Sequence, residues 1–302
     1  MGWALVFSGQ GQQHPDMLRW LQPDALMASA ERTLGSDWRS RLAESECAAN
    51  NQRAQILLTA TSLAAWAQLQ PLVEPPAIVA GYSVGELAAF AAAGVFDAPV
   101  AVALAGLRAQ CMDRAAGTTE AGLLGVTGAL EGGPEALCAR FDLDIAIRID
   151  PGSAVLGGLR ASLRDAAAWA SAQGWRCTPL NIAIASHTRW MRAAAGSFGA
   201  VLAGFECRRP ALPLHSNAQG RVRDAAGARS ALSAQIAQTV QWDECMDAVA
   251  AQRVSAVLEI GPGQALARMW QARQADVPAR SADEFRSVQA IAHWLNRHLD
   301  SR

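Results

Sequence analysis

AIVAGYSVGELAAFAAAG, residues 77–94, carries the strongest structural signal in the chain. Its first five residues form a short apolar run that ends at Gly81, which is typical of a buried strand. The alanine-rich segment after Gly85 predicts a helix, and Gly94 is placed to end it. Only a tight turn fits between the two. The stretch therefore predicts a strand–turn–helix unit with Ser83 at its tip.

Apolar runs on both sides of this unit predict the rest of its layer. WALVF (3–7) stops at a glycine turn, and AVLEIGPG (256–263) ends in another. Helical patterns cover about 16–34, 53–69 and 97–115, then about 188–202, parts of 229–251 and an amphipathic tail, DEFRSVQAIAHWLNRHL. Strands that alternate with helices predict a mainly parallel sheet covered on both faces. We expect an α/β fold with an α/β-hydrolase-like core.

The pattern changes in the middle of the chain. LLGVT, IAIRI, SAVLGG and WRCTPL are typical of short strands, and PEALCAR and ASLRDAAAWASAQ of helices. Strand–helix–strand–strand–helix–strand is the order of a ferredoxin-like unit. We therefore predict an inserted ferredoxin-like small domain over 122–180 and a large domain made of 1–121 and 181–302.

Composition narrows the function classes. The 302 residues are 51% hydrophobic and 18% charged, with a net charge of -1, so neither nucleic acid nor an anionic membrane is an expected partner. The six cysteines include no Cys-x-x-Cys pair, which favours reduced thiols and no metal site. No apolar run approaches the roughly 18 residues of a membrane span, and the N-terminal run is too short for a signal sequence. We expect a cytoplasmic protein.

GYSVG matches Gly-x-Ser-x-Gly in the context that a nucleophile elbow requires, with a strand entering and a helix leaving. Such a turn exposes the Ser83 hydroxyl at a helix N-terminus, where the N–H of Val84 is placed to stabilise an oxyanion. The simpler alternative is a glycine-rich turn with an incidental serine.

A serine nucleophile needs a base, which histidine commonly provides. His187 lies in NIAIASHTRWM, where we expect an apolar strand to end and a helix to begin, so it is the favoured candidate. The others are His14 after the first glycine turn, His215, and the tail-helix pair His293 and His298, for which solvent exposure is favoured.

Arg108 lies in a mostly apolar helical pattern, ALAGLRAQCM. The pattern alone favours a position on the solvent face, because a buried guanidinium must be paired. If Arg108 instead points into a cleft, its planar fork suits a carboxylate.

Six motifs in order resemble those of the malonyl-CoA:acyl-carrier-protein transacylase family over nearly the whole chain. They are FSGQGQQ (7–13), GYSVGE (81–86), LRAQCM (107–112), ASH (185–187), QIAQTVQW (235–242) and EIGPG (259–263). Two positions depart from the family pattern: Ser8 stands where proline is usual, and Tyr82 where histidine is usual.

The resemblance implies a role for each matching residue. Ser83 would be the acylated nucleophile and His187 its base, without a side-chain acid. The main-chain carbonyl of Gln235 would orient His187, and Gln10 would form the oxyanion hole with Val84. Three further residues complete the site: Arg108 would bind the malonyl carboxylate, and Met112 and Ser186 would line the acyl pocket. The implied partners are malonyl-CoA and an acyl-carrier protein. CoA is then part of a substrate, and no cofactor is expected.

Tyr82 and the tail VPARSADEFRSVQAIAHWL resemble the malonyl-transferring epsilon subunit of bacterial malonate decarboxylase. That subunit loads a carrier subunit whose prosthetic group is a modified dephospho-CoA, so this carrier is the favoured partner. Tyr82 can also be a packing change alone. The alternative within the family is the transacylase of fatty-acid or polyketide synthesis.

Two other classes stay open. A serine hydrolase or thioesterase would use His293 or His298 as its base, with an acid earlier in the chain. A non-catalytic scaffold would keep the site as a relic. Arg189 and Arg192, which follow His187, are candidates to contact an acidic carrier, although a solvated helix face is the favoured interpretation.

Overall fold

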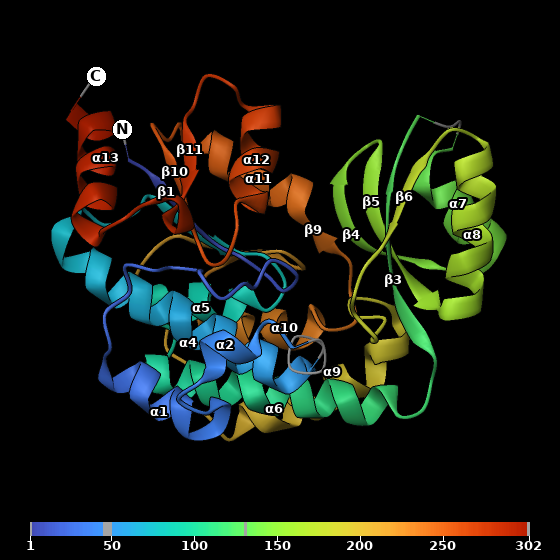
Figure 1. The fold of residues 1–302 in the computed structure, drawn as a ribbon, viewed down its shortest axis with the longest axis horizontal. Helices are drawn as coiled ribbons and strands as arrows, with labels where there is room; N and C mark the ends of the chain where they lie inside the picture. Colours follow the sequence, from blue (N-terminus) through green and yellow to red (C-terminus); the bar gives the residue numbers. More distant parts are fainter. Residues whose placement is uncertain (1, 45–49, 130–131, 301–302) are drawn as a thin grey trace.

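The computed structural model describes residues 2–44, 50–129 and 132–300, and its larger sheet has six strands (Figure 1). Their order is β11-β10-β1-β2-β7-β8, and every neighbouring pair is parallel except β7 and β8. The predicted mainly parallel sheet is confirmed. The strands are β1 (Ala4–Phe7), β2 (Ile78–Gly81), β7 (Leu214–Ser216), β8 (Gly220–Val222), β10 (Val257–Ile260) and β11 (Ala279–Ser281).

Alternate residues of β1 enter two different hydrophobic clusters, because side chains of a strand point to opposite faces in turn. Leu5 and Phe7 pack on one face, and Ala4 and Val6 on the other. The first face is covered by α4 (Asn51–Leu69), α5 (Gly85–Ala92), α6 (Ala98–Ala116), α9 (Arg192–Ala203), α10 (Ala225–Ala234) and α13 (Val288–Asp300). The second is covered by α11 (Trp242–Ala251) and α12 (Ala265–Arg273).

A second sheet lies to one side of the first, with two helices on its outer face (Figure 1). In chain order, this sheet and its two helices are β3 (Ala121–Thr127), α7 (Gly133–Phe141), β4 (Asp144–Asp150), β5 (Ser153–Leu159), α8 (Arg160–Ala172) and β6 (Arg176–Pro179). The strand order is β6-β3-β5-β4-β9, and β3, β4, β5 and β6 pair antiparallel. The predicted element order is present. The ferredoxin-like classification and the domain limits stay predictions.

The strand β9 (Val240–Gln241) extends this second sheet, although it lies outside 122–180. It pairs parallel to β4 and leads directly into α11, which packs against the large sheet. Residues 235–242 therefore join the two sheets, so the segment that follows α10 is positioned by both.

The structure corrects three expectations about local structure. The helix predicted from residue 16 begins only at Ala25, as α1 (Ala25–Leu34), because Asp24 caps it through the N–H of Met27 and residues 15–20 form turns. The expected strand before His187 is absent, and residues 180–188 run as irregular chain. The tail helix predicted from Asp283 begins only at Val288, as α13, and is preceded by the short helix η3 (Ala282–Glu284). The helix predicted from about 188 opens with the short helix η2 (Arg189–Met191), whereas the sequence did not predict α2 (Trp38–Arg41) or the short helix η1 (Gln70–Leu72).

The cysteines in the described part of the chain are free thiols, and Cys47 lies outside it. Across the same residues, no helix is both long enough and apolar enough to pass through a bilayer.

Candidate active site

Ser83 stands at the turn between β2 and α5, as predicted. Its φ is 55°, a left-handed conformation that non-glycine residues rarely adopt. The flanking glycines are required by close approach: a Cβ on Gly81 would lie 2.3 Å from the carbonyl of Gly85, and one on Gly85 would lie 2.4 Å from the oxygen of Phe7. The elbow is therefore held against β1 and cannot relax without a shift of backbone.

His187 contacts Ser83 directly. The Ser83 Oγ lies 2.7 Å from Nε2 of His187, and Nδ1 of His187 lies 2.5 Å from the main-chain oxygen of Gln235. A carbonyl only accepts hydrogen bonds, so Nδ1 carries the proton and Nε2 is free to accept from the serine hydroxyl. His187 also has a left-handed φ, 65°. Its main-chain N–H donates to the oxygen of Ile236, which fixes the residue from a second side.

The electrostatics of the site keep this imidazole neutral. Burial and the nearby positive charge of Arg108 lower the pKa of His187 to about 3, while the hydrogen bond to Gln235 opposes the shift. Nε2 is thus an available proton acceptor throughout the neutral range. The structure supplies the orienting carbonyl at the position that the family resemblance implied.

Arg108 is buried, with 1% of its surface exposed, so the pattern-based expectation of a solvent-facing side chain is wrong. Its Nη1 donates to Oε1 of Gln55 at 2.7 Å, and its Nη2 donates to Oε1 of Gln235 at 3.1 Å. Its Nε has no hydrogen-bond partner. Burial lowers the pKa of Arg108 to about 10, which leaves it charged at neutral pH.

Glu86, in the first turn of α5, is an acidic group close enough to interact with the charge of Arg108 when it is ionised. It is fully buried, and burial raises its pKa to about 8. Oε1 accepts from the N–H of Asn217 at 2.6 Å, while Oε2 has no partner. A carboxyl that holds its proton at pH 7 does not neutralise Arg108. The site therefore contains a buried cation with unused donors, an arrangement that suits an anionic group.

Sequence reasoning did not assign Gln55 or Glu86. Gln55 lies in α4, where it is surrounded by apolar residues and fully buried. An amide at the start of so apolar a run signals a buried polar contact, although not its partner. Gln235 was assigned only for its main-chain oxygen, but its side chain also holds Arg108 and so links the arginine to His187.

The two proposed oxyanion donors come from neighbouring turns. Val84 precedes the first turn of α5, where an N–H has no partner within the helix. Gln10 follows Gly9, whose Cβ, if present, would lie 2.9 Å from the main-chain oxygen of Tyr82 and 3.6 Å from the Cβ of Ser83. Gln10 therefore lies beside the elbow. It also lines a cavity of about 420 Å³ together with Asn51, Asp113, Asn181 and Ile184 among others.

The remaining predicted residues differ in how they are placed. Met112 is buried and its sulfur accepts from Nε2 of Gln55 at 3.6 Å, so it borders the arginine site. Ser186 is buried next to His187 in the chain. Tyr82 packs edge-on against Trp242, with ring centroids 5.2 Å apart. That contact explains Tyr82 by packing alone.

Two other predicted groups do not join the site. Arg189 is engaged by Asp144 and Asp142, at 2.9 and 2.5 Å, so its charge is already paired. His293 and His298 lie on α13, and Nδ1 of His298 bonds to the carbonyl of Trp294. The histidine that meets Ser83 is His187.

The chain is similar to known proteins over nearly its whole length. Residues 4–296 match the family described as acyl transferase domain. The chain is 34% identical to the malonyl CoA-acyl carrier protein transacylase of Mycobacterium bovis, over 96% of this chain and 99% of the relative, and 30% identical to that of Salmonella typhimurium, over 87% and 90%.

Solved structures are similar over the same extent. MCAT from Mycobacterium tuberculosis has a TM-score of 0.85 and 32% identity, and the match covers 96% of this chain and 99% of that one. A chain of PlMCAT:AntF, described as a type II PKS acyl-carrier protein in complex with its malonyl-transacylase, has a TM-score of 0.89 and 27% identity, covering 97% and 99%.

Proposed function

Because the chain belongs to the acyl transferase domain family, among the malonyl CoA-acyl carrier protein transacylases, we propose that it moves malonyl from malonyl-CoA to the thiol of an acyl carrier protein through an ester on Ser83. One observation carries the proposal. Ser83 is hydrogen-bonded to His187, and His187 is hydrogen-bonded to the main-chain oxygen of Gln235. The side chain of the same glutamine accepts a hydrogen bond from the buried cation of Arg108. Nucleophile, base and carboxylate-binding group thus form one unit.

The first half of the reaction acylates the serine. Nε2 of His187 takes the proton of Ser83 as Oγ attacks the thioester carbonyl. The main-chain N–H groups of Val84 and Gln10 stabilise the oxyanion. When the C–S bond breaks, His187 returns the proton to the CoA thiolate. Because His187 starts neutral, it gains and gives back one proton within each half-reaction.

The second half reverses the chemistry with a different thiol. The carrier thiol gives its proton to His187 and attacks malonyl-Ser83, and the serine leaves with that proton. The same hydrogen-bonded pair serves both halves, which gives a ping-pong mechanism with a CoA thioester as substrate and no further cofactor. The cavity beside Gln10 is the proposed approach for both thiols.

Arg108 supplies the acyl specificity in this proposal. The terminal carboxylate of malonyl would accept from the donors that Gln55 and Gln235 leave unused. Binding at that end fixes the ester carbonyl relative to Gln10 and Val84, so the interaction improves orientation as well as affinity. An acetyl group cannot make this contact.

The names of the similar proteins give evidence about the pathway in which this chain acts. Those reported above are named malonyl CoA-acyl carrier protein transacylases, and one similar structure contains a polyketide acyl-carrier protein. They favour an acyl carrier protein of fatty-acid or polyketide synthesis over the malonate decarboxylase carrier that the sequence favoured. The malonate decarboxylase role remains a second proposal, supported by the C-terminal segment VPARSADEFRSVQAIAHWL and by Tyr82, although the packing of Tyr82 against Trp242 also explains that residue.

Covalent labelling tests the central claim. Wild-type protein mixed with radiolabelled malonyl-CoA is expected to retain label after denaturation, and Ser83→Ala is expected to retain none. Label that persists in Ser83→Ala would refute the ester on Ser83. Release of CoA without a carrier separates the hydrolase alternative: fast turnover in its absence favours hydrolysis, whereas release limited to one equivalent favours transfer.

A carrier competition tests the pathway. The malonylated protein is offered an acyl carrier protein with phosphopantetheine and a decarboxylase carrier with the modified dephospho-CoA group. Faster transfer to the first supports fatty-acid or polyketide synthesis, and faster transfer to the second supports malonate decarboxylase.

A further inference from the structure

The segment that carries Gln10 has little structure of its own. Residues 8–14 form neither helix nor strand, and residues 15–20 form turns before α1 begins. Within the described ranges, the Gln10 side chain makes no hydrogen bond. A donor that must meet an oxyanion needs a fixed position, because errors of about an ångström already weaken catalysis. Something outside the segment must therefore hold it.

A buried carboxyl fixes the chain just before Gln10. Ser8 Oγ donates to Oε1 of Glu259 at 2.7 Å, and Oε2 of Glu259 accepts from the N–H of Ala267. Both Ser8 and Glu259 are buried. This contact uses the serine that departs from the family pattern, so the hydroxyl replaces the rigidity of proline with a hydrogen bond to β10.

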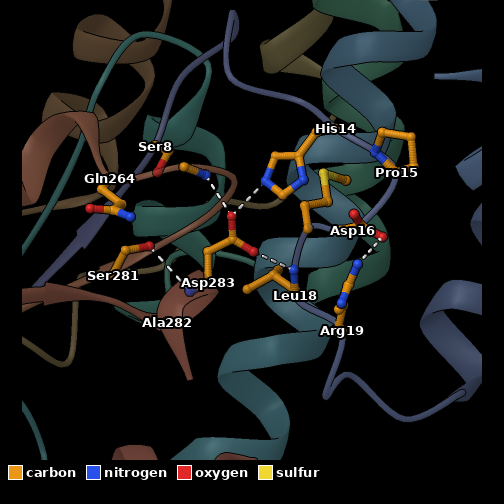
Figure 2. A network of polar contacts seen from close by, with 12 residues as sticks. Ser8, His14, Pro15, Asp16, Leu18, Arg19, Gln264, Ser281, Ala282 and Asp283 are labelled. Carbon is orange, nitrogen blue, oxygen red and sulfur yellow. Dashed lines mark hydrogen bonds and ion pairs between the residues drawn. The ribbon is translucent and has the colours of Figure 1, made fainter. Parts of the chain in front are cut away.

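A second carboxyl, that of Asp283, fixes the chain after Gln10 and lies at the centre of Figure 2. Oδ2 lies 2.8 Å from Nε2 of His14 and accepts from the N–H of Gly263, also at 2.8 Å. Oδ1 accepts from the N–H of Leu18 at 2.5 Å. Only 6% of the Asp283 side chain is exposed. One carboxylate thus joins two points of the segment to the glycine turn after β10.

Two further features show that this contact shapes the segment. Leu18 has a φ of 48°, which a leucine keeps only where its surroundings impose it, and its N–H is one of the groups that Asp283 holds. The turn at Gly263 packs so closely on the segment that a Cβ there would lie 2.9 Å from that of Gln12. Asp283 itself is set by η3, where Ser281 and Glu284 form a capping box.

We propose that Asp283 is a positioning residue for Gln10. Through His14, Leu18 and Gly263 it holds the Gln10 segment against the elbow, so that the main-chain N–H of Gln10 meets the oxyanion formed at Ser83. The inference rests on the proposed function. Asp283 does not act on the substrate itself; it acts through Gln10.

A double-mutant cycle on the acylation step tests this. The rate of malonyl-Ser83 formation is measured in single turnovers with malonyl-CoA for wild type, Asp283→Asn, Gln10→Pro, which removes the main-chain N–H, and the double variant. Asparagine keeps the shape of the side chain, but its NH2 group replaces one of two oxygens that both face N–H donors. We expect Asp283→Asn to slow acylation roughly tenfold or more at saturating malonyl-CoA, with little change in the half-saturating concentration. In the Gln10→Pro background the same change should have an effect below about threefold.

His14 provides a milder variant, because 42% of its side chain is exposed and its loss is less disruptive to folding. His14→Ala is expected to slow acylation in the same Gln10-dependent way, and His14→Gln to restore most of the rate, since its amide can donate to Asp283. Asp97→Asn is the matched control: it removes an aspartate charge from an ion pair, with Arg208, that lies on the exposed surface. Its acylation rate should equal that of wild type.

Several outcomes overturn the proposal. Equal slowing by Asp283→Asn with and without Gln10 would mean that Asp283 acts on the whole fold, and unchanged rates in Asp283→Asn and His14→Ala would mean that it does not act at all. If Gln10→Pro acylates as fast as wild type while Ser83→Ala is not labelled, the positioning claim fails but malonyl transfer stands. If Ser83→Ala is labelled, the proposed function fails first.

Discussion

Replacing Arg108 tests the carboxylate site most directly. Gln55 and Gln235 each take one N–H from the two terminal nitrogens, which leaves a second N–H on each and that of Nε. A malonyl carboxylate that accepts two of these forms charge-assisted hydrogen bonds worth about 1.5–3 kcal/mol each. Their loss in Arg108→Gln should therefore cost about 3–6 kcal/mol, or a fall of about 10²- to 10⁴-fold in kcat/KM for malonyl transfer.

The assay compares malonyl-CoA with acetyl-CoA on the same variants. Acetyl lacks the terminal carboxylate, so its slower transfer should fall by less than about tenfold in Arg108→Gln. Arg108→Lys keeps the charge without the planar fork and should lie between wild type and Arg108→Gln for malonyl. Equal losses for the two acyl groups in Arg108→Gln would refute the reasoning, because they would show that Arg108 supports the fold or the base rather than the malonyl tail.

Two further predictions follow from buried titratable groups. The Glu86 carboxyl has an ordinary pKa of 4.5 in the unfolded chain and a pKa of about 8 in the folded protein. The unfolded state therefore loses this proton first as the pH rises. Between these two values the free energy of unfolding falls by up to about 1.4 kcal/mol per pH unit. Glu86→Gln should flatten this fall in thermal midpoints measured from pH 5 to 8; an unchanged slope would contradict the shift. Because the pKa of His187 is lowered to about 3, kcat/KM for malonyl-CoA should show no acid limb near pH 6.5, and a limb at that pH would show that His187 titrates normally.

The elbow was predictable because everything it needs is local. A short apolar run, two glycines and a helix-forming segment lie within eighteen residues, and the close approaches at Gly81 and Gly85 are the physical reason for that composition. The parallel sheet followed from the same kind of pattern. His187 was chosen for its place after an apolar run, and it does contact Ser83, although the run is not a strand.

The groups that hold Arg108 were not predictable in this way. Its helix is apolar on most sides, so periodicity cannot tell a buried arginine from an exposed one. The burial of Arg108 depends on its contacts with Gln55 on α4 and Gln235 after α10, which lie 53 and 127 residues away in the chain. Asp283 is a similar case, since its partner His14 is 269 residues distant. Such contacts depend on the packing of whole elements, and no local pattern encodes them.

The buried charge of Arg108 also acts on the catalytic base. Its positive charge is one of the causes that lower the pKa of His187. Removing the charge in Arg108→Gln therefore raises that pKa and makes His187 a stronger base, which favours proton removal from Ser83. A loss of malonyl transfer in that variant is therefore not caused by a lower pKa of His187. A displaced base, through loss of the Arg108–Gln235 hydrogen bond, would slow malonyl and acetyl transfer alike, so the acetyl comparison detects it. In the wild type, a malonyl carboxylate bound to Arg108 offsets the charge of the arginine. The pKa of His187 is therefore also expected to rise when the correct acyl group is in place, which makes His187 a stronger base.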